Sequence, residues 1–258
     1  MHRFFGSLYF SVPRSFIRTC PFTPCLCFTN PCPVVSFVDC MFYNGWIPPR
    51  PMVQDVSIAY SKLAKSYDSK WGWFCDSAWA AALPLLPDLA GKWVLDAGCG
   101  TGLMTDRLSD EVGNWGQVVA IDVCQEMLDK AQCRVSDRRN VTLHRAPITA
   151  VPARDRSFDL VVCSSVVHMV SDLGPSLKEW RRVLNTNGEV VVQDYDAAHW
   201  FTSLAHRFWR LKKATYNRAW RVEEVESALK NHGFAIIESR KASLSRFWRI
   251  WLIRARKE

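Results

Sequence analysis

Three glycines and two acidic residues form the most chemically informative pattern in the sequence. Gly98, Gly100 and Gly102 lie in the stretch KWVLDAGCGTGLMTDRLSD, between an apolar strand pattern and a helix pattern. Glycine at such a corner permits a tight turn and lets a ligand approach the backbone closely. Asp96 precedes the first glycine, and Asp122 closes the next predicted strand. This spacing predicts a ligand site at the corner.

The residue types at this corner distinguish between classes of ligand. A dinucleotide site requires a small residue where this chain has Leu103, and a phosphate loop requires a Gly-Lys-Ser/Thr sequence that is absent here. The carboxylate of Asp122 can accept both ribose hydroxyls of a nucleoside. Asp96 would repel a pyrophosphate and attract the ammonium group of an amino acid. S-adenosylmethionine combines a ribose and an ammonium group without a phosphate, and it is the ligand that this pattern predicts.

The elements that position this corner alternate between strands and helices. The predicted strands are Trp93–Ala97, Val118–Ile121, Val141–Leu143, Phe158–Cys163, Glu189–Gln193, Phe234–Glu238 and Phe247–Ile253. Helix patterns fill most intervals, and the one in DLGPSLKEWRRVLNTNG is expected to end at the Asn-Gly pair. The alternation predicts an α/β fold with a doubly wound, mostly parallel sheet. Ligands of such sheets bind beyond the carboxyl ends of the strands, where the glycine corner lies.

Length and composition allow one α/β domain with an additional segment. The chain has 258 residues, of which 48% are apolar, and a formal charge of +8. The basic excess is concentrated from His199 to Glu258, which holds 14 Lys/Arg and 5 Asp/Glu. The ten cysteines are interpreted as reduced, and the cluster from Cys20 to Cys32 lacks both a histidine and the usual ligand spacing. We therefore expect no metal site.

Residues 1–50 are expected to be a poorly ordered extension that precedes a domain at 51–258. The first 38 residues contain three arginines and no Asp or Glu, which resembles an organelle transit peptide. This composition predicts a mitochondrial protein, and a cytoplasmic protein with an extension is the alternative. Four prolines interrupt the uncharged stretch Thr19–Val38, so no transmembrane helix is expected there.

Four stretches of the sequence together resemble a known family. VLDAGCGTG, VVAIDVCQEML, DRSFDLVVCSSVVHMV and LKEWRRVLNTNGEVVVQD are similar to the class I S-adenosylmethionine-dependent methyltransferases. Within them, the chain most resembles the type 11 branch that includes the ubiquinone/menaquinone C-methyltransferases. The resemblance covers about Val53 to Lys257. It implies a Rossmann-like fold of seven strands, with an antiparallel last strand and a helical cap insertion at about residues 197–221. It also implies S-adenosylmethionine as cofactor and a small-molecule methyl acceptor.

The same resemblance implies roles for individual residues. Asp96 and the glycine loop would hold the methionine part of the cofactor, Asp122 the ribose, and Met127 or Val123 the adenine. Ser164 and Ser165 would face the methyl group, while Tyr60 or Tyr67 would close over the cofactor unless both are ordinary half-buried helix residues. The implied cofactor-binding set is Asp96, Gly98, Cys99, Gly100, Gly102, Asp122, Val123, Met127, Ile148, Ser164, Tyr60 and Tyr67.

The chain departs from the family pattern at the residues before the fourth strand. The family has Gly-Asp-Ala there, with the Asp bonding the adenine amine, whereas this chain has Ala146-Pro147-Ile148. Pro147 supplies neither a carboxylate nor a backbone donor. We expect either a weaker affinity for adenine or recognition by backbone groups such as the N–H of Ile148.

Catalytic residues are harder to identify, because methyl transfer is an in-line displacement that depends mainly on alignment in a dry pocket. His168 follows the fourth strand, so it is a candidate base or substrate ligand, with a structural role as the alternative. Asp194 ends the fifth strand on the ligand side and is a second candidate, together with Tyr195 and Asp196. One of these acids could instead cap the next helix.

The cap segment is amphipathic and basic. Its apolar face is formed by Phe201, Leu204, Ala205, Phe208 and Leu211. The first interpretation is that this face completes the core while the basic face is solvated. The alternatives are peripheral contact with an anionic membrane or binding of acidic carriers or RNA.

The sequence therefore predicts a methyltransferase that acts on a small apolar or aromatic acceptor. A catalytically silent methyltransferase-like interaction or assembly subunit is the alternative, because Pro147 and the undefined base leave room for it. An RNA methyltransferase ranks lower, since the Asn/Asp-Pro-Pro-Tyr/Phe signature of base-amine methylation is absent.

Overall fold

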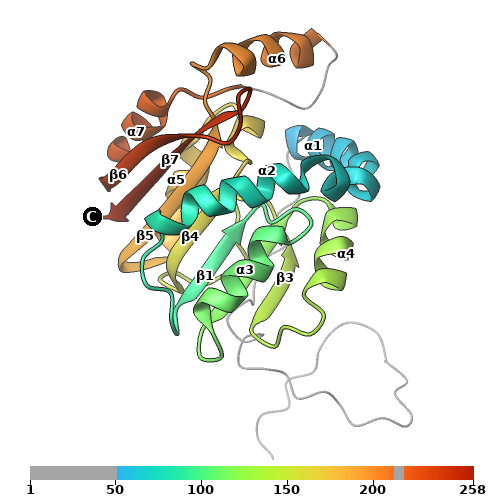
Figure 1. Cartoon of the computed structure of the whole chain (residues 1–258). Coiled ribbons are helices and arrows are strands. Elements are labelled where there is room, and N and C mark those ends of the chain that lie inside the picture. Colours follow the sequence, from blue (N-terminus) through green and yellow to red (C-terminus); the bar gives the residue numbers. More distant parts are fainter. Residues whose placement is uncertain (1–50, 212–217) are drawn as a thin grey trace, which may run out of the picture. The chain divides into compact units, whose positions relative to one another are not determined.

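The computed structural model describes residues 51–211 and 218–258, which form a central sheet with helices on both faces (Figure 1). The strands are β1 Trp93–Ala97, β2 Gln117–Asp122, β3 Val141–Arg145, β4 Phe158–Ser164, β5 Leu184–Tyr195, β6 Phe234–Ser243 and β7 Arg249–Lys257. The helices are α1 Pro51–Leu63, α2 Tyr67–Ala82, α3 Leu103–Val112, α4 Gln125–Arg134, α5 Gly174–Val183, α6 Trp200–Leu211 and α7 Val222–Asn231. Short 3-10 turns are η2 Ala64–Ser66, η3 Leu83–Leu85 and η4 Val167–Met169. The predicted transit peptide, the cysteine cluster and the stretch Thr19–Val38 lie outside the described residues.

The seven strands form one sheet in the order β3-β2-β1-β4-β5-β7-β6. All pairings are parallel except those of β7, which is antiparallel to both β5 and β6. The predicted fold class, including the antiparallel last strand, is confirmed. Since β1 pairs with β2 on one side and β4 on the other, the strand order reverses at β1. This reversal opens a crevice at the carboxyl ends of β1 and β4.

The core has two layers because successive residues of a strand point to opposite faces of the sheet. Leu95 of β1 lies in a buried cluster with Trp180 of α5 and Leu229 of α7. Its neighbour Val94 lies with Leu108 of α3 on the other face. Helices on both faces explain why the parallel strands read as nearly continuous apolar runs.

Two local predictions are wrong. Helix α5 ends at Val183 rather than at the Asn-Gly pair, because Leu184 already pairs with Phe158 in the sheet. Asn187 has a φ of 62° inside β5, where the register between β4 and β5 shifts. The last strand begins at Arg249 rather than at Phe247. Its burial between β5 and β6 agrees with its apolar residues on both faces.

The predicted cap segment contains α6, but the prediction that its apolar face completes the core is wrong at Leu204. This side chain is 61% exposed and that of Trp200 is 59% exposed, whereas Thr202 is fully buried. Phe201 and Ala205 of the same stripe are half-buried, so only part of the predicted face packs inward. Across the described ranges 51–211 and 218–258, no helix is long and apolar enough to cross a membrane.

Candidate active site

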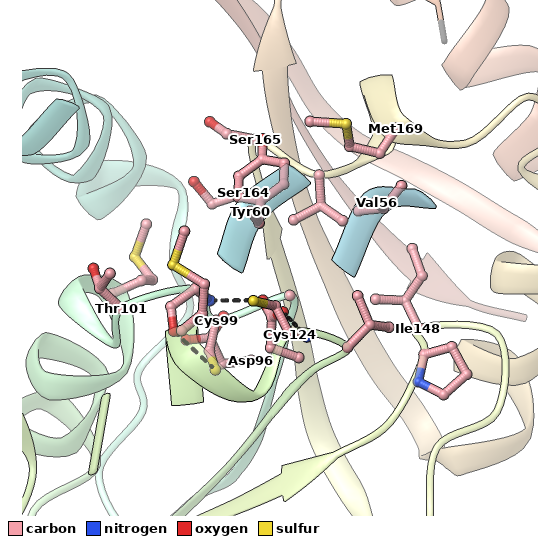
Figure 2. Close-up of a pocket in the computed structure, with 18 of the residues that line it drawn as sticks. Val56, Tyr60, Asp96, Cys99, Thr101, Cys124, Ile148, Ser164, Ser165 and Met169 are labelled. Atoms are coloured by element: carbon pink, nitrogen blue, oxygen red, sulfur yellow. Dashed lines mark hydrogen bonds between the residues drawn. The ribbon is translucent and has the colours of Figure 1, made fainter. Parts of the chain in front are cut away.

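A cavity of about 170 Å³ lies at the carboxyl ends of β1, β2 and β4. Since one water molecule requires only about 10–15 Å³ of such space, the cavity can hold a ligand of many atoms. Figure 2 shows side chains from four places around it: Asp96 in β1 and Cys99 just after it, Val56 and Tyr60 from α1, Ile148 after β3, and Ser164 at the end of β4. The predicted residues Gly98, Gly100, Asp122, Val123, Met127, Tyr67 and Ser165 also line it.

The glycine turn after β1 has left-handed backbone at all three glycines. The φ angles of Gly98, Gly100 and Gly102 are 87°, 55° and 80°, which glycine adopts without steric cost. A Cβ at Gly98 would lie 2.4 Å from Cγ2 of Val166, and one at Gly102 would lie 3.0 Å from Cβ of Ala131. A Cβ at Gly100 would meet nothing within 4 Å. Gly98 and Gly102 therefore permit close packing, and Gly100 presents bare backbone to the open cavity.

Asp122 is held at the end of β2 by two backbone donors. Its Oδ2 accepts from the N–H of Gly100 at 2.9 Å, and its Oδ1 accepts from the N–H of Cys124 at 2.8 Å. Burial raises the pKa of this carboxyl despite these bonds. Each oxygen keeps further acceptor capacity toward the cavity. The arrangement therefore presents a rigid pair of acceptors to a ligand with two neighbouring hydroxyls.

Asp96 lies deeper than Asp122, at the end of β1. It is 1% exposed, and its Oδ2 accepts from Oγ1 of Thr105 in α3 at 2.6 Å. Burial raises its pKa from 3.8 to about 7, against the opposing effect of the Thr105 bond. Among residues 51–211 and 218–258 no cationic side chain pairs with this buried carboxyl, so it is suited to a ligand that brings a positive charge.

This pKa predicts a pH-dependent stability. The pKa of Asp96 is higher in the folded chain than its ordinary value. The stabilisation of the folded state by the protonated carboxyl is therefore fully present below about pH 4, and it is lost as pH rises through 7. We expect the free energy of unfolding of the wild type, relative to Asp96→Asn, to fall by about 3 kcal/mol between these pH values. Denaturant titrations of both proteins at several pH values measure this difference. A constant difference would show that Asp96 is not proton-linked to folding.

The opening helices supply the aromatic wall of the cavity. Tyr60 of α1 and Tyr67 of α2 lie with ring centroids 6.2 Å apart, and both pack with Met127 of α4. Burial raises the pKa of both phenols, so they stay neutral. The structure thus places both tyrosines where the resemblance implies contact with a cofactor.

A polar network that the sequence analysis missed ties α2 to the glycine turn. Asp68 accepts from Oγ1 of Thr101 and from the guanidinium of Arg134, both at 2.6 Å. Arg134 also donates to the carbonyl of Thr101 at 3.0 Å. No sequence motif joins these three residues, because they lie on α2, the turn and α4.

The two catalytic candidates contact each other and do not line the cavity. His168 is 4% exposed, and its Nδ1 lies 2.9 Å from Oδ1 of Asp194. The backbone N–H of His168 also donates to Oδ2 of Asp194, at 3.0 Å. Asp196 accepts from the N–H of Ala198 at 3.1 Å, in the turn that precedes α6, so the capping alternative stays a prediction. A catalytic role for His168 or Asp194 stays a prediction, and the geometry shows a structural pair beside the cavity.

Ser164 is held by Gln193, whose Nε2 donates to its Oγ at 2.7 Å. The adjoining wall is apolar, and the sequence analysis missed its members Val56, Met104, Val166, Met169 and Val170. Cys75 and Cys124 also line the cavity, and burial raises the pKa of both thiols to about 11. These thiols are therefore neutral at physiological pH. Within the described residues, no group of three or more His, Cys, Asp or Glu side chains could hold a metal ion.

Comparison with known proteins agrees with this geometry. Residues 95–192 match the family model described as a methyltransferase domain. The fold and the cavity thus define a class I methyltransferase domain. Over these residues the chain is similar to the class I S-adenosylmethionine-dependent methyltransferases and has their fold, as the resemblance predicted.

Curated relatives include the demethylmenaquinone methyltransferase of Staphylococcus aureus, which is 38% identical over 101 residues. That of Lactobacillus johnsonii is 36% identical over 104 residues. These alignments cover 39% of this chain and 42% and 43% of the two relatives, so the chain matches less than half of their length.

Solved structures with the same fold include a SAM-dependent methyltransferase from Aquifex aeolicus. Its TM-score is 0.62 at 22% identity, and the match covers 77% of this chain and 98% of that one. A methyltransferase from Mesorhizobium loti has a TM-score of 0.61 at 20% identity, covering 70% and 98%. At these identities the structures establish the fold alone.

Proposed function

We propose that this protein transfers a methyl group from S-adenosylmethionine to a small, apolar or aromatic organic acceptor. The observation that carries the proposal is the pair of carboxyls, buried Asp96 and half-buried Asp122, on either side of a glycine turn at one cavity. This pair suits an ammonium group and a ribose, and it would repel a phosphate.

The residues present fit S-adenosylmethionine. Asp96 and the bare backbone at Gly100 would receive the methionine part, and the two oxygens of Asp122 the ribose hydroxyls. Met127, Val123 and Ile148 would enclose the adenine. When bound, the cofactor supplies a methyl group on a positively charged sulfur. The protein's own contribution is to align the acceptor and to exclude water from the cavity.

The wall beyond Ser164 supports an apolar acceptor. Val56, Met169 and Val170 line this part of the cavity, and the phenol of Tyr60 stays neutral beside them. The curated relatives are named as methylating demethylmenaquinone, an aromatic molecule with an apolar chain, which supports the same class of acceptor.

The test is calorimetry with the full chain, followed by assays with labelled cofactor and reduced quinones as acceptors. We expect micromolar binding of S-adenosylmethionine and transfer of label to an aromatic acceptor. Binding without transfer to any acceptor would favour the catalytically silent alternative, and no binding would overturn the proposal.

We further propose that the cap contacts an anionic membrane. Trp200 and Phe201 of α6 and Phe247 of the β6–β7 turn form one aromatic cluster, with ring centroids 5.4 to 6.3 Å apart. Trp200 and Phe247 are 59% and 45% exposed, and Arg246 lies over the Phe247 ring. Residues 200–221 contain six Lys/Arg and no Asp/Glu. Exposed aromatics beside a basic segment are typical of peripheral membrane proteins.

The cluster lies at the same edge of the sheet as the cavity, because β6 runs parallel to β5 and ends at that edge. We expect Phe247→Ser to weaken binding to phosphatidylglycerol vesicles about tenfold, measured by sedimentation. Trp115→Ser is the matched control, since Trp115 is 92% exposed just before the amino end of β2. Equal losses in both variants, or equal binding to neutral vesicles, would contradict the proposal. Mitochondrial localisation is likewise our proposal, and an import assay with the full chain tests it.

A further inference from the structure

The loop between β3 and β4 forms the wall of the cavity next to Ile148. Ala146, Pro147, Ile148 and Thr149 all line the cavity. None of these four residues carries a carboxylate, and Pro147 occupies the position where the family resemblance implies Asp. In the part of the chain that the structure describes, no hydrogen-bond acceptor is found for the backbone N–H of Ile148. The wall therefore offers a ligand backbone groups instead of a charged side chain.

Backbone groups discriminate between ligands only if the loop that carries them is held in place. The loop has internal bonds from Ala150 N–H to the carbonyl of Pro147 and from Ala153 N–H to that of Val151, at 3.0 and 2.7 Å. It has no regular secondary structure between Arg145 and Phe158. Contacts with another element must therefore fix its position.

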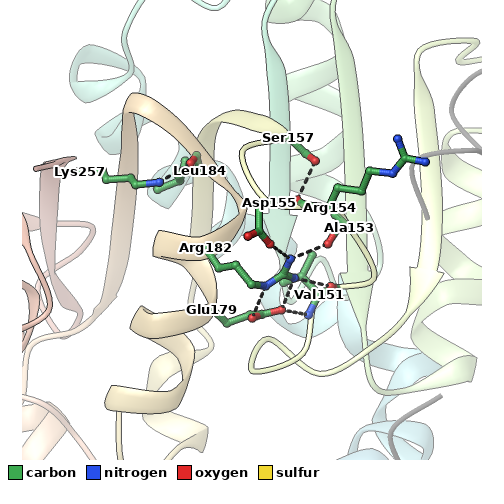
Figure 3. Close-up of polar contacts among 9 residues, drawn as sticks. All are labelled: Val151, Ala153, Arg154, Asp155, Ser157, Glu179, Arg182, Leu184 and Lys257. Atoms are coloured by element: carbon green, nitrogen blue, oxygen red, sulfur yellow. Dashed lines mark hydrogen bonds and ion pairs between the residues drawn. The ribbon is translucent and has the colours of Figure 1, made fainter. Parts of the chain in front are cut away.

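Helix α5 supplies these contacts through Arg182 and Glu179 (Figure 3). Arg182 donates to the carbonyls of Ala153 and Val151 at 2.8 and 3.1 Å. It also donates to both carboxylate oxygens of Glu179, at 2.9 and 2.7 Å. Glu179 in turn accepts from the N–H of Val151 at 2.7 Å. The two side chains therefore engage both the donor and the acceptor of one loop residue.

The geometry requires these residue types. The planar guanidinium of Arg182 reaches two carbonyls and a carboxylate at once, which the single ammonium of a lysine cannot do. Glu179 is only 15% exposed in its side chain, so water competes weakly for the pair. The further bond from Arg182 to Asp155 reaches a carboxylate that is 72% exposed, and it contributes little.

We propose that Arg182, paired with Glu179, is a positioning residue that holds the β3–β4 loop so that the backbone at Ile148 recognises the adenine ring. The inference rests on the proposed function. Helix α5 does not line the cavity. The inference nevertheless gives this helix control over which base binds, in a chain that has Pro147 where the family resemblance implies Asp.

The experiment compares S-adenosylhomocysteine with S-inosylhomocysteine. Adenine presents an acceptor at N1, to which the N–H of Ile148 can donate, whereas the inosine base presents an N–H there. We expect the wild type to prefer the adenosyl compound by about tenfold or more, because the wrong base leaves polar groups unpaired. Arg182→Met should weaken binding of the adenosyl compound about tenfold and reduce the preference to about threefold or less.

Arg181→Met is the matched control. Arg181 is adjacent on α5, is exposed, and donates to the carbonyl of Glu258 rather than to the loop. Its replacement should leave both dissociation constants unchanged. Hydrogen exchange of the unliganded protein gives a readout independent of the cofactor, and the hydrogen-bonded amides of Ala150, Val151 and Ala153 should exchange faster in Arg182→Met alone. Arg182→Lys keeps the charge and serves if the methionine variant does not fold; it should show a smaller shift in the same direction.

Several results would overturn the inference. One is an unchanged preference in Arg182→Met, or in Arg182→Lys if only that variant folds. Another is an equal loss of both ligands, which would indicate a general structural role. A third is unchanged exchange of the loop. If the wild type binds neither compound, the proposed function itself is wrong and the inference is wrong with it. If the wild type prefers the adenosyl compound and the Arg182 variant keeps the same preference, the inference is wrong but the proposed function stands.

Discussion

Replacing Asp122 with asparagine is expected to weaken binding of S-adenosylmethionine by about 100-fold or more. Both carboxylate oxygens of Asp122 accept from backbone donors, the N–H of Gly100 and the N–H of Cys124. An amide has only one acceptor oxygen, so its NH2 group must face one of these donors. The change also removes one of the two acceptors available to a ribose. Calorimetry on the full chain measures the loss.

The folded state should tolerate this substitution. Burial raises the pKa of the Asp122 carboxyl, so replacing the charged group by a neutral amide relieves desolvation and offsets the lost backbone bond. We expect the free energy of unfolding to change by only about 1 kcal/mol. Asp129→Asn is the control, because Asp129 is an exposed acid on α4 that accepts from Gln125. Unchanged cofactor affinity in the Asp122 variant would refute the assignment of the ribose to this residue.

Gly98→Ala is expected to destabilise the protein by about 3 kcal/mol. The φ of 87° at Gly98 is unfavourable for any L-residue with a side chain, and the new Cβ would lie 2.4 Å from Cγ2 of Val166. Val166 follows β4, and it cannot move away freely because it lies between the glycine turn and the core. Urea titrations monitored by circular dichroism measure the effect.

Gly91→Ala isolates the backbone contribution. Gly91 has a φ of 73°, but a Cβ there would meet nothing within 4 Å. Its replacement should cost about 1–2 kcal/mol, so the excess at Gly98 reports the close contact with Val166. Adding Val166→Ala to Gly98→Ala should recover part of that excess. Equal costs at the two glycines would show that β1 and β4 do not approach each other as closely as the structure indicates.

Several features could be predicted from the sequence because they depend on neighbours in the chain. Alternating strand and helix patterns predicted all seven strands, and the glycine spacing predicted the turn after β1. Asp96 and Asp122 each end a parallel strand, and the ends of adjacent parallel strands meet at one edge of a sheet. The two acids therefore line one cavity, as predicted. The errors at α5 and β7 concern boundaries, where sheet pairing outweighs local turn preferences.

The role of His168 illustrates what local reasoning does not decide. Its position after β4 indicated a reactive group, but its ring pairs with Asp194, 26 residues later in the chain. The orientation of such a side chain depends on which buried acceptor lies nearest in space. Likewise, the apolar stripe of α6 predicted a buried face, whereas Leu204 is exposed and Thr202 is buried.

By itself, the sequence determined the class of fold, the glycine turn and the two acids beside it, because these follow from hydrophobic periodicity and from residues adjacent in the chain. Only the tertiary structure decided which side chains support that site. Asp68 and Arg134 are 66 residues apart, and Arg182 contacts the carbonyl of Val151 31 residues earlier. Such pairings are set by how helices pack across the sheet, and a hydrogen bond between distant residues leaves no periodic signal in the sequence that encodes it.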